Sequence, residues 1–586
     1  MTHLLPEAQD LYTEACSLLD AVDDGLSPEV DGAGEWPLLT LKFGDPSSAA
    51  AVSAVASLLQ KCILNASTLT ATLSGTAGTL PPNSSRSHSN PHFLFALALC
   101  ELGEIHELRT GDRNRARDLY SQAVVAFPDG VEAPRRLAKM LYSEATTEPF
   151  LSKVEKLLKN AVTNAERLET ELDGDDDDET DVLGLAMHDP PLVQRELSFV
   201  PAVRDRLALL YCQTGRDDLA ATQLMAGGYE WRLGREILNY PSTLSHSKTV
   251  SKPSTQSNPA TSPTVESSLV RAVDNSLPPA VLAHLREVFR PSSTFWTAHG
   301  YNEHQSNGYF SYVVDLRPFL HPISPKPPPT LFHASLLHLL RTASHLFPTR
   351  ASSVTHAEFW AHCRPHTSGH QFHFDSENEG VGPGGGPRHP PCTAIVVLSD
   401  GSVGGPTVVT EQVLRPTVRK GKKAKGKRES QDVTKTGLAD SAFAVGPAPG
   451  RVTIFRADVL HGVVPGKPPT PVSSAENPSF STRRVSFMVG FWDGIKAREP
   501  PVLPDGRARP SASMPFPPAH SSHSWYHDTI LSTPAGKLPP FNASKFTPVE
   551  PVKMPGAVWE RVGGAAANES GSRDEVPDYE YCFQGF

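Results

Sequence analysis

Residues 370–375 read His-Gln-Phe-His-Phe-Asp, so that His373 and Asp375 alternate with two phenylalanines. This alternation predicts a β-strand, because successive side chains of a strand point to opposite faces of its sheet. His373 and Asp375 therefore point to the same face and can bind one metal ion together. A further protein ligand must then come from another segment.

His461 is the candidate for that further ligand. It lies in the segment ADVLHGVVP at residues 457–465, which follows an apolar strand predicted at residues 452–455. Two histidines and one carboxylate form the facial triad typical of non-haem Fe(II) oxygenases, in which other coordination positions stay open. A structural zinc site would instead favour cysteine and four protein ligands. We therefore predict an iron site at His373, Asp375 and His461.

A cationic motif follows in RRVSFMVGFW, residues 483–492. The segment is otherwise apolar, and a buried guanidinium needs an anionic partner because an unpaired buried charge is costly. Arg484 and Ser486 share one strand face, so the guanidinium can bind a carboxylate through two hydrogen bonds while the hydroxyl adds another. Arg483 points to the opposite face and is expected to face solvent.

The order of motifs from Gly369 to Trp492 resembles the 2-oxoglutarate/Fe(II) dioxygenase superfamily, particularly its prolyl-hydroxylase-like branch. HFD is followed by TAIVVLS, GGPT, GRVTIF, LHGVVP and RVSF. The resemblance implies that His373, Asp375 and His461 bind Fe(II), and that Arg484, assisted by Ser486, binds the distal carboxylate of 2-oxoglutarate. It also implies O2 as cosubstrate and ascorbate as reductant.

The chain departs from the family pattern in two places. The interval between His461 and Arg484 is longer than usual, which a Pro/Ser-rich loop at residues 466–481 can explain. The tyrosine that many relatives place ahead of the iron-binding strand is missing, and Tyr309 or Tyr312 are candidates to replace it. The remaining histidines nearby, at positions 362, 366 and 370, are expected to make structural hydrogen bonds or orient the iron ligands.

The C-terminal half is rich in short β-segments broken by Gly and Pro. After a helix at residues 280–289, strands are predicted at residues 309–314, 354–363, 371–374, 394–398, 407–410, 452–455, 462–464 and 485–491. This number of short strands is typical of a double-stranded β-helix, or jelly roll. We place this oxygenase domain at residues 269–497, with a Pro/Ser-rich extension at residues 498–586.

Residues 1–241 show apolar side chains at helical spacing, which predicts an all-α, helical-repeat-like domain. Two segments also carry a tetratricopeptide-like pattern, although an irregular helical bundle remains an alternative. The pattern residues are Ala208, Tyr211, Gly215, Ala220, Leu224 and Gly227 in one segment, and Gly111, Ala116, Tyr120, Ala123 and Pro128 in the other, where Gly103 is one residue out of register.

Segments of biased composition separate or interrupt these domains. We expect a solvated acidic loop at residues 166–181, a disordered linker at residues 242–268, and a basic insertion at residues 412–440. The run Lys420 to Arg428 in the insertion predicts a solvated hairpin loop or a nuclear-import signal.

Composition limits the class of protein. The formal net charge of −10 over 586 residues is mild, so nucleic acid is not an expected partner. The seven cysteines form no CxxC pair, and we find neither a signal peptide nor a long apolar stretch. These features predict a cytoplasmic or nuclear protein that does not bind membranes.

Together, these features predict an Fe(II)- and 2-oxoglutarate-dependent dioxygenase that releases succinate and CO2. A protein or peptide substrate is expected, because tetratricopeptide-like helices commonly present concave peptide-binding surfaces. Two alternatives stay open: a small-molecule oxygenase, and an interaction scaffold whose oxygenase barrel is inactive.

Overall fold

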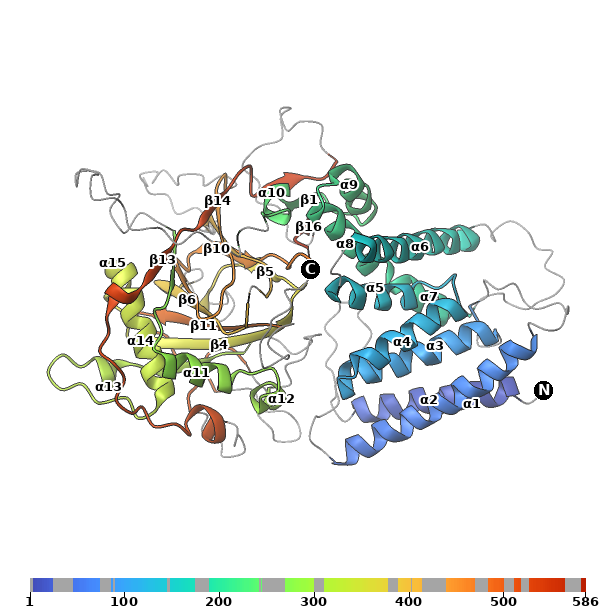
Figure 1. The fold of residues 1–586 in the computed structure, drawn as a ribbon, viewed down its shortest axis with the longest axis horizontal. Coiled ribbons are helices and arrows are strands. Elements are labelled where there is room, and N and C mark those ends of the chain that lie inside the picture. The colour runs from blue at the N-terminus through green and yellow to red at the C-terminus, as the bar shows by residue number, and fades with distance from the viewer. Residues whose placement is uncertain are drawn as a thin grey trace, which may run out of the picture. The chain divides into compact units, whose positions relative to one another are not determined.

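The computed structural model of this chain describes residues 4–24, 46–73, 86–87, 90–144, 148–173, 189–241, 244, 269–299, 310–377, 388–401, 403–413, 439–468, 483–499, 511–517, 526–563 and 581–585. The chain divides into two compact units (Figure 1). The helical unit comprises Met1–Tyr211 and Thr222–Gly227. The sheet unit comprises Cys212–Ala221 and Gly228–Phe586.

The helical unit is built from successive helices that pack against their neighbours along the chain, from α1 through to α6. The helices that lie wholly or partly in this unit are α1 (Leu4–Asp24), α2 (Pro46–Leu73), α3 (Pro91–Glu104), a π-helical turn (Ile105–Thr110), α4 (Arg113–Ala126), α5 (Glu132–Glu144), α6 (Glu148–Asp173), α7 (Pro190–Ser198), α8 (Val200–Gln213) and α9 (Asp217–Ala226). The prediction of a helical N-terminal half is thus confirmed at the level of secondary structure.

Helix α2 is the one described helix that is long and apolar enough, over Val52–Ala71, to cross a membrane by length and composition. Its residues at heptad-like spacing, Val55, Leu59, Cys62 and Ala66, are buried, whereas others such as Leu64 are exposed. Since α2 packs against both α1 and α3, this one-sided burial fits a helix of a bundle, and such helices pass the same test.

Close packing against Tyr120 accounts for the glycine at position 103, which lies next to the tetratricopeptide-like pattern. A Cβ atom added at Gly103 of α3 would lie 2.6 Å from the Tyr120 ring of α4, so glycine allows the two helices to approach. Gly215 lies between α8 and α9 with a φ of 72°, a conformation that favours glycine. The assignment of these helices to tetratricopeptide repeats stays a prediction.

The acidic segment expected to be a loop from residue 166 is helical as far as Asp173, where α6 ends. The helix persists because Leu168 is buried and Arg167 pairs with Glu171 and Asp129, which offsets the repulsion among the acidic side chains. The rest of that segment lies outside the described residues.

The sheet unit contains two large sheets and one small sheet. The larger ones have the strand orders β12-β3-β4-β11-β6-β9-β2-β13 and β14-β8-β7-β10-β5, and the small one is β15-β1-β16. The strands are β1 (Trp231–Leu233), β2 (Val270–Asp274), β3 (Tyr312–Asp315), β4 (His356–Pro365), β5 (His370–His373), β6 (Cys392–Val397), β7 (Thr407–Val413), β8 (Ala442–Val445), β9 (Val452–Phe455), β10 (Val459–Val463), β11 (Arg483–Trp492), β12 (Met514–Pro515), β13 (Thr547–Val549), β14 (Val552–Met554), β15 (Trp559–Arg561) and β16 (Cys582–Phe583).

The two large sheets face each other across an apolar cluster. Trp360 and Met488 of the eight-stranded sheet meet Val409 and Val459 of the five-stranded sheet in this cluster. The alternation of side chains along a strand places apolar residues on the other face as well, so the eight-stranded sheet is buried on both sides.

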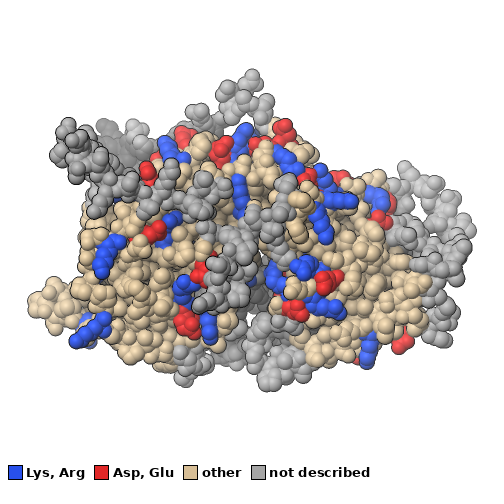
Figure 2. All heavy atoms as spheres, in the orientation of Figure 1, with Lys and Arg blue, Asp and Glu red and all other residues tan. Residues whose placement is uncertain are grey.

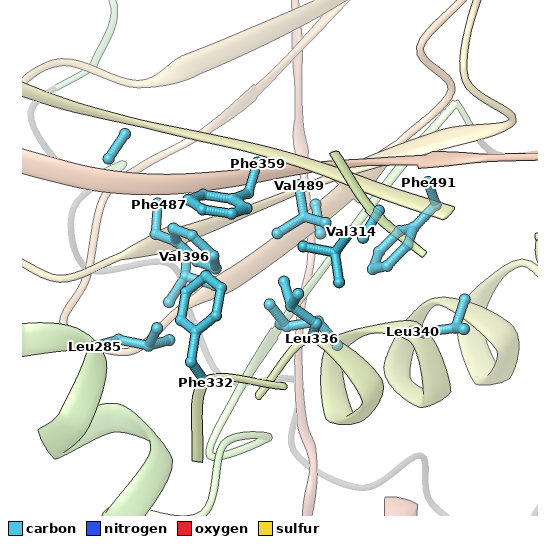
Figure 3. Packing of buried hydrophobic residues seen from close by; sticks show 14 of the residues in the cluster. Leu285, Val314, Phe332, Leu336, Leu340, Phe359, Val396, Phe487, Val489 and Phe491 are labelled. Carbon is cyan, nitrogen blue, oxygen red and sulfur yellow. The ribbon is translucent and has the colours of Figure 1, made fainter. Parts of the chain in front are cut away.

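Helices α11 (Pro279–Val288) and α14 (Leu331–Leu346) cover the outer face of the eight-stranded sheet (Figure 1). Phe332 of α14 packs edge-on against Phe359 of β4 at a ring distance of 4.8 Å, and Leu285 and Leu336 join the same core (Figure 3). The short helices of this unit are α10 (Arg235–Leu238), α12 (Thr294–Ala298), α13 (Arg317–Leu320) and α15 (Pro348–Ala351), together with a π-helical turn (Tyr526–Ile530) and a 3-10 turn (Ala543–Lys545).

Each predicted strand of the C-terminal half overlaps an observed strand. The expectation of a wholly helical segment up to residue 241 is wrong at β1, because Trp231–Leu233 pairs with strands from the far end of the sequence. Apart from Leu244, the expected linker lies outside the described residues.

Strand pairing also places the segments that flank or interrupt the two large sheets. The extension beyond residue 497 supplies β12 to β16, which add to all three sheets. The basic insertion connects β7 and β8, which pair antiparallel, while residues 414–438 lie outside the described residues. On the face drawn in Figure 2, the described Lys and Arg side chains lie intermixed with Asp and Glu.

Candidate active site

Strand pairing brings the three predicted iron ligands together. His373 of β5 and His461 of β10 are direct partners across an antiparallel ladder, with their ring centroids 4.5 Å apart. Oδ1 of Asp375 lies 3.4 Å from Nε2 of His373 and 3.6 Å from Nε2 of His461. One potential ligand atom from each residue lies within 4.8 Å of the other two, so a single ion can bind all three.

Hydrogen bonds to backbone carbonyls orient the imidazole rings of His373 and His461. Nδ1 of His373 lies 2.7 Å from the carbonyl oxygen of Gln371, and Nδ1 of His461 lies 3.0 Å from that of Val459. A carbonyl only accepts, so Nδ1 carries a proton, and in the neutral form of each ring Nε2 has its lone pair toward the shared point. Both rings are therefore oriented as metal ligands before any ion binds.

Thr393 orients the carboxylate of the triad. Its hydroxyl on β6 donates a 2.6 Å hydrogen bond to Oδ2 of Asp375, which leaves Oδ1 directed at the histidines. Burial would raise the pKa of Asp375, but His461 and His373 outweigh it and hold the pKa well below its ordinary value. For His373 burial lowers the pKa, but the bond to Asp375 more than offsets this and raises it.

A cavity of about 580 Å³, including the solvent at its mouth, opens beside the triad. Its walls are contributed by both large sheets. The lining includes the three candidate ligands together with Trp360, His362, Arg364, His370, Ile395, Phe455, Arg484, Ser486 and Met488.

Arg484 is buried in this cavity and held in place by neutral acceptors. Its guanidinium donates to the carbonyl oxygen of Gly405 at 2.6 Å, to the hydroxyl of Thr407 at 3.0 Å and to that of Ser486 at 3.2 Å. Among the described residues no carboxylate is paired with it, and burial lowers its pKa to about 10. Arg484 therefore stays charged at neutral pH and can attract an anionic ligand.

The GGPT motif fits closely around this arginine. Gly404 has a φ of 89°, and a Cβ atom there would lie 2.5 Å from Cδ of Arg484. A Cβ atom at Gly405 would lie 1.9 Å from the carbonyl oxygen of Val464, in the segment that follows the strand of His461. Both glycines are thus required by close approach, and they bring the Arg484 and His461 strands together.

The remaining histidines divide into two kinds. His366 is structural: its Nδ1 accepts from the Gly404 amide at 2.8 Å and its Nε2 donates to the carbonyl oxygen of Lys467 at 2.8 Å. His362 and His370 line the cavity with their rings 4.6 Å apart. Burial, followed by neighbouring positive charge, lowers the pKa of both, so they are neutral imidazoles.

Neither Tyr309 nor Tyr312 is shown to replace the tyrosine that many relatives place ahead of the iron-binding strand. Tyr312 does not line the cavity, because it lies in the core on the helix-covered face of the sheet, where its hydroxyl contacts Nε2 of His299 at 2.8 Å. Tyr309 lies outside the described residues. Arg483, expected to face solvent, is half-buried and donates to the carbonyl oxygen of Cys363 at 2.7 Å.

Residues that sequence reasoning assigned to the helical domain support the loop after β10. The side-chain amide of Gln213 donates to the carbonyl oxygen of Pro465 at 3.1 Å, and the Tyr240 hydroxyl donates to the same oxygen at 3.3 Å. The Tyr240 hydroxyl also accepts from the amide of Lys467 at 2.9 Å. No local pattern predicts these contacts, because the partners are far apart in the sequence.

No known protein family matches the chain, and no curated protein matches it. Solved structures with distant likeness include the following three. AviO1 from Streptomyces viridochromogenes Tue57 is 17% identical, covering 38% of this chain and 90% of that chain, with a TM-score of 0.20. The non-heme alpha-ketoglutarate dependent carbocyclase SnoK from nogalamycin biosynthesis is 14% identical, covering 48% and 92%, with a TM-score of 0.22.

The third is HygX from Streptomyces hygroscopicus, with nickel and 2-oxoglutarate bound. It is 12% identical, covering 42% of this chain and 92% of that chain, with a TM-score of 0.19. Scores of this size establish no family for the chain, so a function has to be inferred from the geometry of the site.

Proposed function

We propose that this chain is an Fe(II)- and 2-oxoglutarate-dependent dioxygenase. The observation that carries the proposal is the convergence of His373, Asp375 and His461 in the same cavity as Arg484, a buried cation without a carboxylate partner among the described residues. Two imidazoles and one carboxylate suit Fe(II) and leave positions for other ligands.

The strand order supports a double-stranded β-helix as the scaffold. Strands β4, β6, β9 and β11 are neighbours in the larger sheet, while β5, β7, β8 and β10 are neighbours in the smaller one. The chain therefore crosses repeatedly between facing sheets, as it does in jelly rolls. This architecture places both ligand strands side by side at one edge of the smaller sheet.

Each side chain has a definable role in the proposed reaction. His373, Asp375 and His461 would hold the iron, with their orientation fixed by the Gln371 and Val459 carbonyls and by Thr393. When bound, Fe(II) and 2-oxoglutarate would supply oxidation of a substrate C–H bond with O2 as the oxidant, one oxygen atom entering the substrate and the other entering succinate as CO2 is released.

Arg484 would bind the carboxylate of 2-oxoglutarate that lies away from the metal, with Ser486 as a further hydrogen-bonding group. Ser486 accepts from Nε of Arg484, so its own hydroxyl proton remains available for a ligand oxygen. The apolar side chains of Ile395, Phe455 and Met488 in the cavity wall would limit the access of water.

We further propose that the substrate is a protein or a peptide and that the enzyme hydroxylates it. The support for this step is the tetratricopeptide-like pattern of the helical unit. Fe(II)-free full-length protein carrying His461→Ala can be used to capture bound proteins, and mass spectrometry of those proteins should reveal an added oxygen when the unaltered enzyme is present. Turnover stimulated only by small molecules would contradict the protein-substrate step.

Anaerobic titration of the full-length chain with Fe(II) and then 2-oxoglutarate tests the oxygenase proposal. We expect a metal-to-ligand charge-transfer band, and succinate formation once O2 is admitted. Both should be lost in His373→Ala and Asp375→Ala, and both should persist in His345→Ala, which changes an exposed histidine of α14. Succinate formation that survives loss of either ligand would contradict the proposal, and absence of the band would favour an inactive scaffold.

A further inference from the structure

The strand that carries His373 lies at the edge of its sheet. In the described part of the chain, β5 pairs with β10 on one side and ends the order of the five-stranded sheet on the other. It is only four residues long. Edge strands leave backbone amides and carbonyls without ladder partners, so something else must hold the outer side of this metal-binding strand.

A side chain from the last described segment does this. Oε1 of Gln584 accepts a 2.8 Å hydrogen bond from the backbone amide of Phe372, the residue immediately before His373. The amide and the glutamine are both buried, and Gln584 is 5% exposed. The bond therefore forms away from water, where its loss would leave a buried donor unsatisfied.

The side chain of Phe372 is confined by the same region of the sequence. A Cβ atom at Gly462, next to His461, would lie 2.5 Å from the Phe372 ring, so the ring rests directly on β10. Its other neighbour is Trp559 of β15, at a ring distance of 6.3 Å, and the Trp559 indole in turn donates to Oε1 of Gln412 at 3.0 Å.

The segment carrying Gln584 is itself anchored by pairing. Strand β16 runs parallel to β1, which pairs on its other side with β15. The amide of Glu230 donates to the carbonyl oxygen of Tyr581 at 3.1 Å, and the rings of Tyr229 and Phe583 pack at 5.5 Å. The small sheet thus presents Gln584 to β5 from a fixed position.

We infer that Gln584 is a positioning residue for the metal site: by binding the Phe372 amide, it fixes β5 so that His373 stays opposite His461. This inference rests on the proposed function. A short edge strand without this contact can shift relative to β10, and the two histidines would then no longer point at one ion. Outer contacts that orient metal ligands typically change metal affinity by about 10- to 100-fold when removed.

Fe(II) affinity of Gln584 variants in the full-length chain tests the inference. Gln584→Met keeps the length of the side chain but removes the acceptor, and we expect its Kd for Fe(II) to rise by about tenfold or more. Gln584→Glu keeps an acceptor oxygen and should restore most of the affinity. Tyr581→Phe is the matched control in the same segment, because that side chain is half-exposed and only its backbone carbonyl is used.

The charge-transfer band formed with 2-oxoglutarate provides the readout, together with KM for 2-oxoglutarate at saturating Fe(II). KM should change little, since the hydrogen bonds that hold Arg484 go to Gly405, Thr407 and Ser486. Unaltered Fe(II) affinity in Gln584→Met would overturn the inference. If Gln584→Met fails to fold, the Fe(II) affinity of Gln584→Asn is measured instead, because this variant keeps the amide but shortens its reach. An unaltered affinity in Gln584→Asn would likewise overturn the inference.

The proposed function and this inference can fail separately. If the unaltered chain forms no Fe(II)/2-oxoglutarate complex, the proposed function falls and the inference falls with it. If the unaltered chain forms the complex and Gln584→Met binds Fe(II) equally well, only the inference is wrong.

Discussion

At the scale of single residues, the candidate site combines groups that spacing can reveal with groups that it cannot. His373 and Asp375 share a strand face in any extended conformation, as do Arg484 and Ser486, so their pairing follows from the sequence. Thr393, which orients Asp375, and Thr407, which holds Arg484, lie in recognisable motifs, but neither position signals a partner. Their roles depend on which strands become neighbours.

The two glycines with positive φ near the site offer a matched comparison. Gly404→Ala should raise KM for 2-oxoglutarate several-fold, because the new methyl group would displace the side chain of Arg484. Gly401→Ala should leave KM unchanged, since a Cβ atom there meets nothing within 4 Å.

Both substitutions place a non-glycine residue in the left-handed region, at φ 89° and 64°, and should lower the free energy of unfolding by about 1–2 kcal/mol. Steady-state kinetics and denaturant unfolding of the two variants check these expectations. Equal KM values in both variants would contradict the role assigned to Gly404.

At the scale of elements, alternation and Gly/Pro punctuation located the strands of the two large sheets that carry the candidate site. The strands β2 and β8 were not predicted, because they are short and flank segments of biased composition. The helix α14 was also missed, although its buried face supports the sheet that holds Arg484. Short apolar segments of these kinds are ambiguous until their packing partners are known.

The loop after β10 contains a lysine whose charge the fold disfavours. Burial lowers the pKa of Lys467 to about 8, and Glu236 opposes this only partly. In the unfolded chain a lysine has a pKa of about 10.4. Between these values the unfolded chain binds more protons than the folded chain, so the stability of the native protein rises with pH in that window.

We therefore expect the stability of Lys467→Met relative to the native chain to fall as pH rises from 7 to 10. Denaturant unfolding at both pH values measures the difference. Lys496→Met, which changes an exposed lysine of the same unit, should show no such trend. If the difference in the free energy of unfolding between Lys467→Met and the native chain stays constant with pH, the lowered pKa of Lys467 is contradicted.

At the scale of the whole molecule, the boundary of the sheet unit differs from the change in sequence composition. The expected linker begins after residue 241, but residues 212–221 and the segment from Gly228 onward belong to the sheet unit. Strand β1 lies between β15 and β16, and Gln213 and Tyr240 support the loop after the His461 strand. The sheet unit thus includes chain from both sides of the expected linker.

Cleavage within residues 245–268 tests this organisation. A protease site placed there should yield two fragments that remain together on size-exclusion chromatography under native conditions, because β1 pairs on both edges. Arg232→Pro removes an amide donor from the middle of β1 and should weaken the association. Fragments that separate without this substitution would show that the segments on either side of the cleavage site are independent.

The sequence by itself determined which candidate site residues share a strand face. Strand periodicity is local, so the alignment of His373 with Asp375, and of Arg484 with Ser486, needs no knowledge of distant segments. Helical spacing likewise predicted the N-terminal helices. The motif order added expectations of fold and cofactor, and the strand order is in line with the expected fold.

Only the tertiary structure decided which distant residues meet. It pairs His461 with His373, brings Thr393 to Asp375 and Gln584 to Phe372, and joins Arg136 of α5 to Glu104 of α3 at 2.9 Å. The physical reason is that these contacts form through packing of whole sheets and helices. Local spacing fixes the direction of a side chain but carries no information about its partner.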